Sequence, residues 1–273
     1  MIQLRKPAVA GLFYPADPQK LESEIKQHLK NSIPSFIPSK VFGLVSPHAG
    51  YVYSGSSAAY GFNTLQNKKF KTVIIISPSH KEYFPGVSIY NGDAYETPLG
   101  EIPIDQEISD LLVDNKANIF RGINGHRDEH AIEVQLPFLQ YVLEDFSIVP
   151  IVMGDQSKIF IDALADKLKE VVNEYTLLIA SSDLSHYYSA DEAEEKDSRI
   201  ERSINEYNIE QFVSDISNKK CEACGAGPIL SVMKSVKENN KNKSLVLNRT
   251  HSGYVSGDYD QVVGYLSAVF YGE

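Results

Sequence analysis

The chain of 273 residues is 42% hydrophobic and 23% charged, which is typical of globular proteins long enough to bury a sizeable core. Its net charge of −10 disfavours nucleic acid and anionic membranes as partners, because both need a basic surface. No apolar run approaches the ~20 residues that cross a membrane and no apolar signal core is visible, so we expect a cytoplasmic protein.

The chain shows no sign of a division into domains. It has no long tract of proline, glycine or serine, no charge block and no internal repeat, so we expect residues 1–273 to form one domain. Its two cysteines, Cys221 and Cys224, suit a reducing compartment and exclude a disulfide scaffold. The pattern leaves the oligomeric state open.

Predicted helices and buried strands alternate along the chain. The apolar spacing predicts helices over 21–29, 54–65, 108–112, 132–143, 159–172, 190–204, 209–216 and 224–236. Pro137 lies inside the fourth pattern, so that helix starts near the proline or bends there. The highly charged helix over 190–204 is expected to be solvated, and 239–243 is expected to be a polar turn. Continuous apolar runs predict strands at 41–46, 73–77, 87–90, 146–153, 177–181, 245–247 and 262–270. We therefore expect an α/β protein with three α/β/α layers around a largely parallel or mixed central sheet.

Two predicted strands lead into serine, proline and then histidine. The run at 41–46 leads to His48, and the run at 73–77 leads to His80. Ligands of open α/β sheets bind at the carboxyl ends of strands. A lone loop histidine is more often a surface or hydrogen-bonding residue, but the matched contexts favour a shared site. If the two strands are neighbours, His48 and His80 converge at one edge of the sheet.

Polar residues also follow the predicted strand at 177–181. Asp183 and His186 come directly after it, at a spacing that also suits the capping of a turn. Taken alone, that spacing favours the turn. The position after a buried strand shifts both residues towards a role in the site.

Cys224 stands at the predicted start of a helix, where the local positive potential lowers a thiol pKa and favours the thiolate. The Cys221 and Cys224 pair suggests a thioredoxin-like motif or half of a zinc cluster. The surrounding sequence does not resemble a thioredoxin active site, and a four-cysteine zinc site would need a second cysteine pair, which the chain lacks. A small buried apolar side chain remains the competing interpretation of Cys224.

The remaining histidines give weaker signals. His126, His130 and Glu133 form a cluster that we interpret as a charged helix start, and their roles stay unassigned. His251 follows a predicted strand and has no assigned role, whereas His28 lies on a predicted surface helix.

Six ordered blocks, which span nearly the whole chain, resemble the Memo family of the AmmeMemoRadiSam grouping. They are Ala8–Pro15, Pro47–Gly55, Ser77–His80, Asp128–Glu133, Ser182–His186 and Cys224-Gly225. The resemblance implies a fold similar to the class III extradiol dioxygenases and a metal site with two histidines and a cysteine. These ligands fall on His48, His80 and Cys224, while Asp183 and His186 match polar residues that line the pocket.

The resemblance implies a divalent transition metal, with iron expected first and copper or zinc as alternatives. Cys224 supplies sulfur where the dioxygenases supply a carboxylate. We expect an iron- or copper-dependent oxidoreductase for a small, phenolic molecule, with His186 as general acid or base and Asp183 as its orienting partner. One alternative is a binding or adaptor protein for a peptide or small ligand, and another is a metal-free hydrolase with Cys224 as nucleophile and His186 as base.

Overall fold

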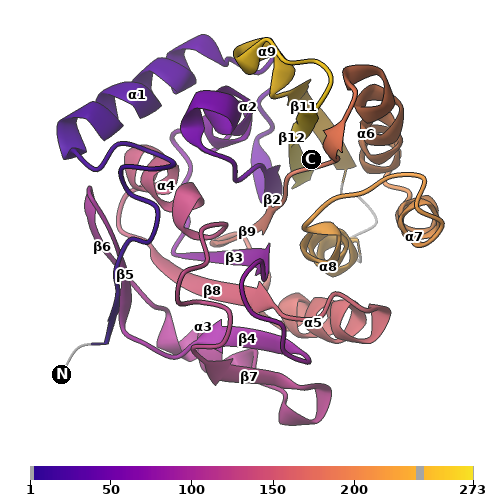
Figure 1. The fold of residues 1–273 in the computed structure, drawn as a ribbon. Coiled ribbons are helices and arrows are strands. Elements are labelled where there is room, and N and C mark those ends of the chain that lie inside the picture. Colours follow the sequence, from indigo (N-terminus) through magenta and orange to yellow (C-terminus); the bar gives the residue numbers. More distant parts are fainter. Residues whose placement is uncertain (1–2, 238–242, 273) are drawn as a thin grey trace.

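The computed structural model describes residues 3–237 and 243–272, and a large mixed sheet runs through its centre (Figure 1). The strand order within these residues is β10-β12-β2-β9-β3-β8-β4-β7, with β11 also paired to β12. A smaller sheet, β1-β5-β6, lies beside it.

The strands and helices have the following bounds. The strands are β1 (Leu4–Arg5), β2 (Lys40–Ser46), β3 (Thr72–Pro78), β4 (Val87–Tyr90), β5 (Ala94–Thr97), β6 (Gly100–Pro103), β7 (Ile119–Gly122), β8 (Ser147–Met153), β9 (Thr176–Ser181), β10 (His186–Tyr188), β11 (Lys243–His251) and β12 (Val262–Gly272). The helices are α1 (Pro18–Asn31), α2 (Tyr51–Asn63), α3 (Gln106–Leu111), α4 (Leu136–Val142), α5 (Lys158–Val171), α6 (Ala190–Asn205), α7 (Ile209–Ser217), α8 (Ala226–Val236) and α9 (Gly253–Ser256). Two short 3₁₀ helices cover Asn115–Ala117 and Glu133–Gln135.

The two faces of the sheet carry separate apolar cores because successive side chains of each buried strand point to opposite sides. Ile75 of β3 packs into the core beneath α1, α2 and α4, whereas Ile74 and Ile76 pack into the core beneath α5 to α8. Figure 1 shows the same division of helices around the sheet. The predicted three-layer α/β/α architecture is confirmed.

The central strands β2, β9, β3 and β8 are parallel to one another. The sheet becomes mixed towards its edges, because β12 runs antiparallel to β2 and β4 runs antiparallel to β8. The strands leading to His48 and His80 are not direct neighbours, the condition under which convergence was inferred, since β9 lies between β2 and β3. All three nevertheless end at the same edge, and the end of β9 adds Asp183 to that edge.

Several predicted segments differ in detail from the structure. The helix that contains Pro137 begins at Leu136 rather than at 132, which confirms the expected start near the proline; proline is tolerated there because the first-turn N–H groups have no intrahelical partner. Helix α6 buries one face through Ala193, Ile200 and Ile204, so it is less solvated than its charge predicted. Of the polar turn predicted at 239–243, residues 239–242 lie outside the described residues. Within the described ranges, no helix is both long and apolar enough to cross a bilayer.

Candidate metal centre

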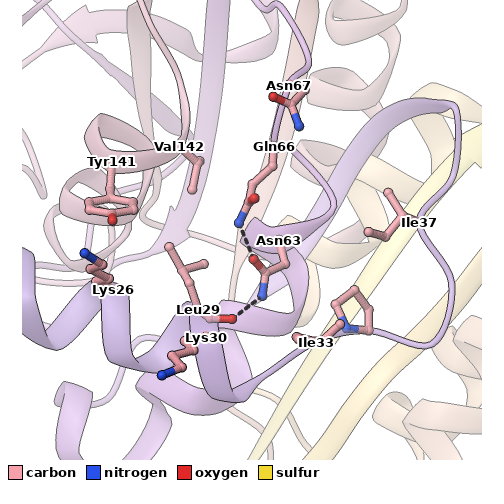
Figure 2. Close-up of a pocket in the computed structure, with 11 residues that line it drawn as sticks. Lys26, Leu29, Lys30, Ile33, Ile37, Asn63, Gln66, Asn67, Tyr141 and Val142 are labelled. Carbon is pink, nitrogen blue, oxygen red and sulfur yellow. Dashed lines mark hydrogen bonds between the residues drawn. The ribbon is translucent and has the colours of Figure 1, made fainter.

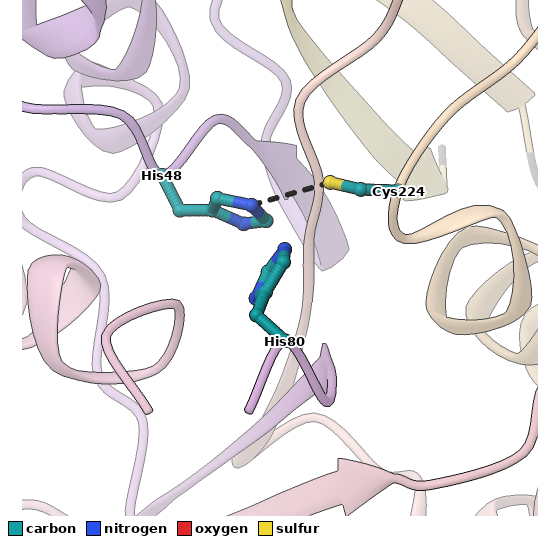
Figure 3. A group of neighbouring side chains, drawn as sticks. All are labelled: His48, His80 and Cys224. Atoms are coloured by element: carbon teal, nitrogen blue, oxygen red, sulfur yellow. Dashed lines mark hydrogen bonds between the residues drawn. The ribbon is translucent and has the colours of Figure 1, made fainter. Parts of the chain in front are cut away.

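The structure brings His48, His80 and Cys224 together at the carboxyl edge of the sheet (Figure 3). The ring centroids of the two histidines are 5.0 Å apart. The Sγ atom of Cys224 lies 3.2 Å from Nε2 of His48. One ligand-type atom from each of the three residues lies within 4.8 Å of the others. Tetrahedral metal bonds of about 2.0–2.3 Å separate adjacent ligand atoms by roughly 3.5 Å, so the donor set fits one ion after small movements.

His48 is buried, and its other ring nitrogen is held by the end of β9. Nδ1 of His48 lies 2.9 Å from Oγ of Ser181. The Ser181 hydroxyl donates to the Ala131 carbonyl and accepts from the Gln135 amide, so the hydrogen between Ser181 and His48 comes from Nδ1. This pattern leaves the lone pair of Nε2 directed towards Cys224 and free to bind a cation.

His80 is oriented in the same way by a carboxylate. Nδ1 of His80 lies 2.9 Å from Oε1 of Glu129, and the backbone N–H of His80 donates to Oε2 at 2.7 Å. Burial raises the pKa of Glu129, but the hydrogen bonds and charge of His80 outweigh it and lower the pKa to about 2. A carboxylate behind a ligating imidazole fixes its tautomer and strengthens it as a donor.

Cys224 comes from the turn between α7 and α8, one residue before the cap of α8. Its Sγ accepts a hydrogen bond from the backbone N–H of Asp183 at 3.2 Å. Burial, followed by the nearby Asp183 carboxyl, raises the pKa of the Cys224 thiol above its usual range. The expected lowering by the helix start is therefore outweighed, and a cation in the site would supply the missing stabilisation of the thiolate.

Two histidines of the site, His48 and His130, are uncharged at neutral pH. Burial, followed by the charge of His80, lowers the pKa of His48 to about 3. Burial and His48 lower the pKa of His130 to about 4. Neutral imidazoles need no proton removed before they bind a metal, so this edge of the sheet is electrostatically prepared for a cation.

Asp183 and His186 lie beside this group with different degrees of contact. Oδ1 of Asp183 accepts the backbone N–H of His48 at 2.8 Å, and Oδ2 lies 4.0 Å from Nε2 of the same histidine. Burial raises the pKa of Asp183. His186 lies at the start of β10, a strand absent from the sequence prediction, and is near enough for its charge to act on both His48 and Asp183.

The cluster around His126 and Glu133 divides into two parts. His130 joins the site, since its ring centroid lies 4.8 Å from that of His80 and 5.4 Å from that of His48. Glu129 also belongs there, which the interpretation as a charged helix start missed. His126 instead contacts Tyr95 and the Ser88 carbonyl, and the buried Glu133 pairs with Arg5.

Two other histidines lie away from the three donors. His251 stacks on Tyr254 with ring centroids 4.3 Å apart. His28 contacts Ser56 and packs beside Tyr51. Neither joins a group of metal-ligand atoms among the described residues.

A separate cavity of about 660 Å³ lies between α1, α2 and α4 (Figure 2). Asn63 lines this cavity, and its Nδ2 donates a hydrogen bond to the Leu29 carbonyl at 2.8 Å. Lys26 and Lys30 line it together with apolar and amide side chains. It contains none of the histidines or cysteines discussed above, so its size alone does not identify it as a reaction site.

The sequence matches the family model described as "Memo-like protein" over residues 5–269. It is 41% identical to a MEMO1 family protein of Thermoplasma volcanium over 268 residues, which cover 97% of this chain and 98% of that protein. It is 37% identical to a MEMO1 family protein of Methanosarcina mazei over 272 residues, covering 98% of this chain and 99% of that one. A MEMO1 family protein of Thermotoga maritima is 38% identical over 281 residues, with 98% and 99% covered.

Proposed function

Because the chain belongs to the Memo family, we propose that it is a metal-dependent oxidoreductase in which His48, His80 and Cys224 hold one divalent transition-metal ion. The observation that supports this proposal is the convergence of the three donors, with Nδ1 of each imidazole already engaged elsewhere. Three protein ligands leave coordination positions for a small molecule.

The donor set favours redox chemistry. Two neutral imidazoles and one thiolate leave a divalent centre with one positive charge, which an ionised Asp183 would neutralise. Nitrogen and sulfur donors suit iron, copper and zinc, and affinity alone favours copper, so metal availability selects among them. We take iron as the first candidate. When bound, such an ion supplies one-electron chemistry to a small, phenolic substrate.

In this proposal His186 transfers protons and Asp183 orients the polar groups of the pocket. Imidazole side chains commonly serve as general acids or bases near neutral pH. His186→Gln should retain the metal while lowering turnover. Loss of metal from this variant would show instead that His186 acts as a ligand.

The test is elemental analysis with electron paramagnetic resonance on anaerobically purified wild type and Cys224→Ser. We expect about one iron or copper ion per chain in the wild type, and a changed spectrum with weaker retention in the variant. A metal-free wild type that takes up no added Fe²⁺ or Cu²⁺ would refute the proposal. Oxygen uptake with catechol-type substrates then tests the oxidoreductase assignment.

A second candidate is a binding protein that uses the same pocket for a peptide or small ligand. Tyr187 and Tyr53 are 72% and 42% exposed. After burial, nearby Asp183, Tyr53 and Tyr187 also raise the pKa of Tyr265, so the two exposed tyrosines lie on the same side of the molecule as Asp183. Exposed tyrosines near the candidate metal centre suit ligand contacts. Arg127 and Arg249 pair with carboxylates, which disfavours a phosphorylated ligand. Ligand binding without oxygen uptake would favour this candidate.

A metal-free hydrolase has the least support. The raised pKa of Cys224 disfavours a free thiolate nucleophile. The imidazole in contact with Sγ is also that of His48 rather than His186, the base that this alternative requires.

A further inference from the structure

A buried ion pair lies directly behind the loop that carries Glu129. Arg5 and Glu133 are 5% and 0% exposed and contact each other through Nη1 and Oε2. Glu133 also accepts hydrogen bonds from the backbone N–H groups of Ala8 and Val9 and from the Tyr14 hydroxyl. These bonds fix the N-terminal segment, residues 5–14, to the short 3₁₀ helix that precedes α4.

The guanidinium of Arg5 holds the loop between β7 and α4 at two points. Nε donates to the His126 carbonyl at 3.2 Å, and Nη2 donates to the Glu129 carbonyl. The Glu129 side chain in turn holds both the ring and the backbone N–H of His80. A continuous chain of hydrogen bonds therefore runs from Arg5 through Glu129 to His80.

The same N-terminal segment reaches the loop that carries His48. The Phe13 carbonyl accepts the backbone N–H of Tyr51 at 2.7 Å, immediately after that loop. The Phe13 ring packs edge-on against His130, with ring centroids 4.9 Å apart. Residues 5–14 thus contact two loops of the candidate metal centre that are distant from each other in sequence.

We propose that the N-terminal segment is a positioning element of the metal centre and that Arg5 is its positioning residue for His80. This inference rests on the proposed metal site. Since Lys lacks the planar fork of Arg, Arg5→Lys keeps a charge beside Glu133 but cannot bond both carbonyls in the same geometry. Loss of these bonds frees the Glu129 loop and releases His80 from a single tautomer.

The test measures Co²⁺ binding and the His80 tautomer in wild type, Arg5→Lys and Arg5→Met. We expect both variants to bind Co²⁺ about tenfold more weakly, as is usual when groups behind metal ligands are disturbed, with a shifted visible spectrum. Nitrogen NMR of the metal-free proteins should show His80 protonated at Nδ1 in the wild type and mixed tautomers in the variants. Arg5→Lys keeps the test informative where Arg5→Met fails to fold.

The matched control is Leu168→Ala, a core substitution in α5 that lowers the melting temperature without contacting this network. It should retain the wild-type Co²⁺ affinity, the wild-type spectrum and the His80 tautomer. Arg5 variants that behave like this control would overturn the inference. A wild type that binds no Co²⁺ would instead refute the metal site, and the NMR comparison would still decide whether Arg5 positions His80.

Discussion

At the scale of single residues, Glu129 orders the site although it ligates nothing in our proposal. Its carboxylate is 2% exposed and accepts hydrogen bonds from the ring and backbone of His80 and from the backbone N–H groups of His130 and Ala131. Charged acceptors make stronger bonds than neutral ones, and a buried carboxylate with several donors is rigidly held. The position of His80 is therefore set by a neighbour that is distant in sequence.

Glu129→Gln should weaken metal binding by about 10–100-fold, because the amide keeps one acceptor oxygen and loses the charge that polarises His80. The measurement is Co²⁺ titration against a chromophoric chelator. Glu101→Gln, at an exposed position of β6, is the control and should bind Co²⁺ as the wild type does. Equal affinities for the Glu129 and Glu101 variants would contradict the role given to Glu129.

The convergence of His48 and His80 was expected from the strand pattern and the addition of Cys224 from the family resemblance, whereas Glu129 was not foreseen. His48 and His80 follow continuous apolar runs, and Cys224 precedes a helix, so each stands at a recognisable boundary. Glu129 stands among charged residues in a loop, where most carboxylates face solvent. Its partner His80 lies 49 residues away, a pairing that exists only after the sheet has formed.

At the scale of elements, the turn before α8 is held close to the end of β9. A Cβ atom on Gly225 would lie 2.4 Å from the Ser181 carbonyl oxygen and 2.7 Å from Cβ of Ser182. The N–H of Gly225 donates to Oγ of Ser182 at 2.9 Å. Only glycine permits this approach, which places Cys224 within reach of the histidines.

Gly225→Ala should move Cys224 away from His48 and destabilise the fold by about 1–3 kcal/mol, the usual cost of overpacking. We expect the thiolate-to-Co²⁺ absorption band to be lost or displaced, and the urea midpoint to fall. The control is Gly100→Ala on the exposed turn of β6, where a Cβ meets nothing within 4 Å but the positive φ of 120° still imposes backbone strain. If both variants lose stability but only Gly225→Ala alters the absorption band, close packing at Gly225 positions the Cys224 thiolate. An unchanged band in Gly225→Ala would contradict this role of Gly225.

A gentler test of the same turn uses Gln156, whose amide joins the loop after β8 to Cys224. Its Nε2 donates to the Cys224 carbonyl at 2.8 Å, and its Oε1 accepts the Gly227 N–H at 2.7 Å. Gln156→Glu keeps the second bond and loses the first, so Co²⁺ should dissociate several-fold faster with little change in melting temperature. Gln140→Glu is the control because the amide of Gln140, in α4, also makes two hydrogen bonds, one with the Thr97 hydroxyl and one with the Gly100 carbonyl. Equal dissociation rates in both variants would exclude a positioning role for Gln156.

The long elements were predictable because their apolar patterns are local, but their order in the sheet was not. The runs that became β2, β3, β8 and β9 are each buried over nearly their whole length. An apolar run does not identify the strand that will pair with it, so the position of β9 between β2 and β3 was not predicted. The short strands β7 and β10 depend on their partners β4 and β12 more than on their own three or four residues.

At the scale of the whole molecule, the described residues bury several uncharged histidines, and this couples stability to pH. Burial is the first cause that lowers the pKa of His48 and of His126 to about 3, and of His130 to about 4. In the unfolded chain the same groups bind protons below about 6.5. Stability therefore falls as pH decreases from about 6.5 towards these folded values, because the unfolded state takes up more protons. Asp197 opposes the trend, since burial raises its pKa to about 6.

His126 provides the test of this coupling, because it lies outside the donor set and its contacts suit a glutamine. His126→Gln should reduce the slope of unfolding free energy against pH by roughly 1 kcal/mol per pH unit between pH 4.5 and 6, since one proton is no longer taken up on unfolding. The measurement is urea unfolding of metal-free protein across that range. Tyr95→Phe removes the hydroxyl that lies 2.8 Å from Nδ1 of His126 but keeps the imidazole, so it should lower stability while retaining the wild-type slope. Parallel slopes in the wild type and His126→Gln would mean that His126 is already protonated in the folded protein. Burial would then not keep this histidine neutral as it does His48 and His130.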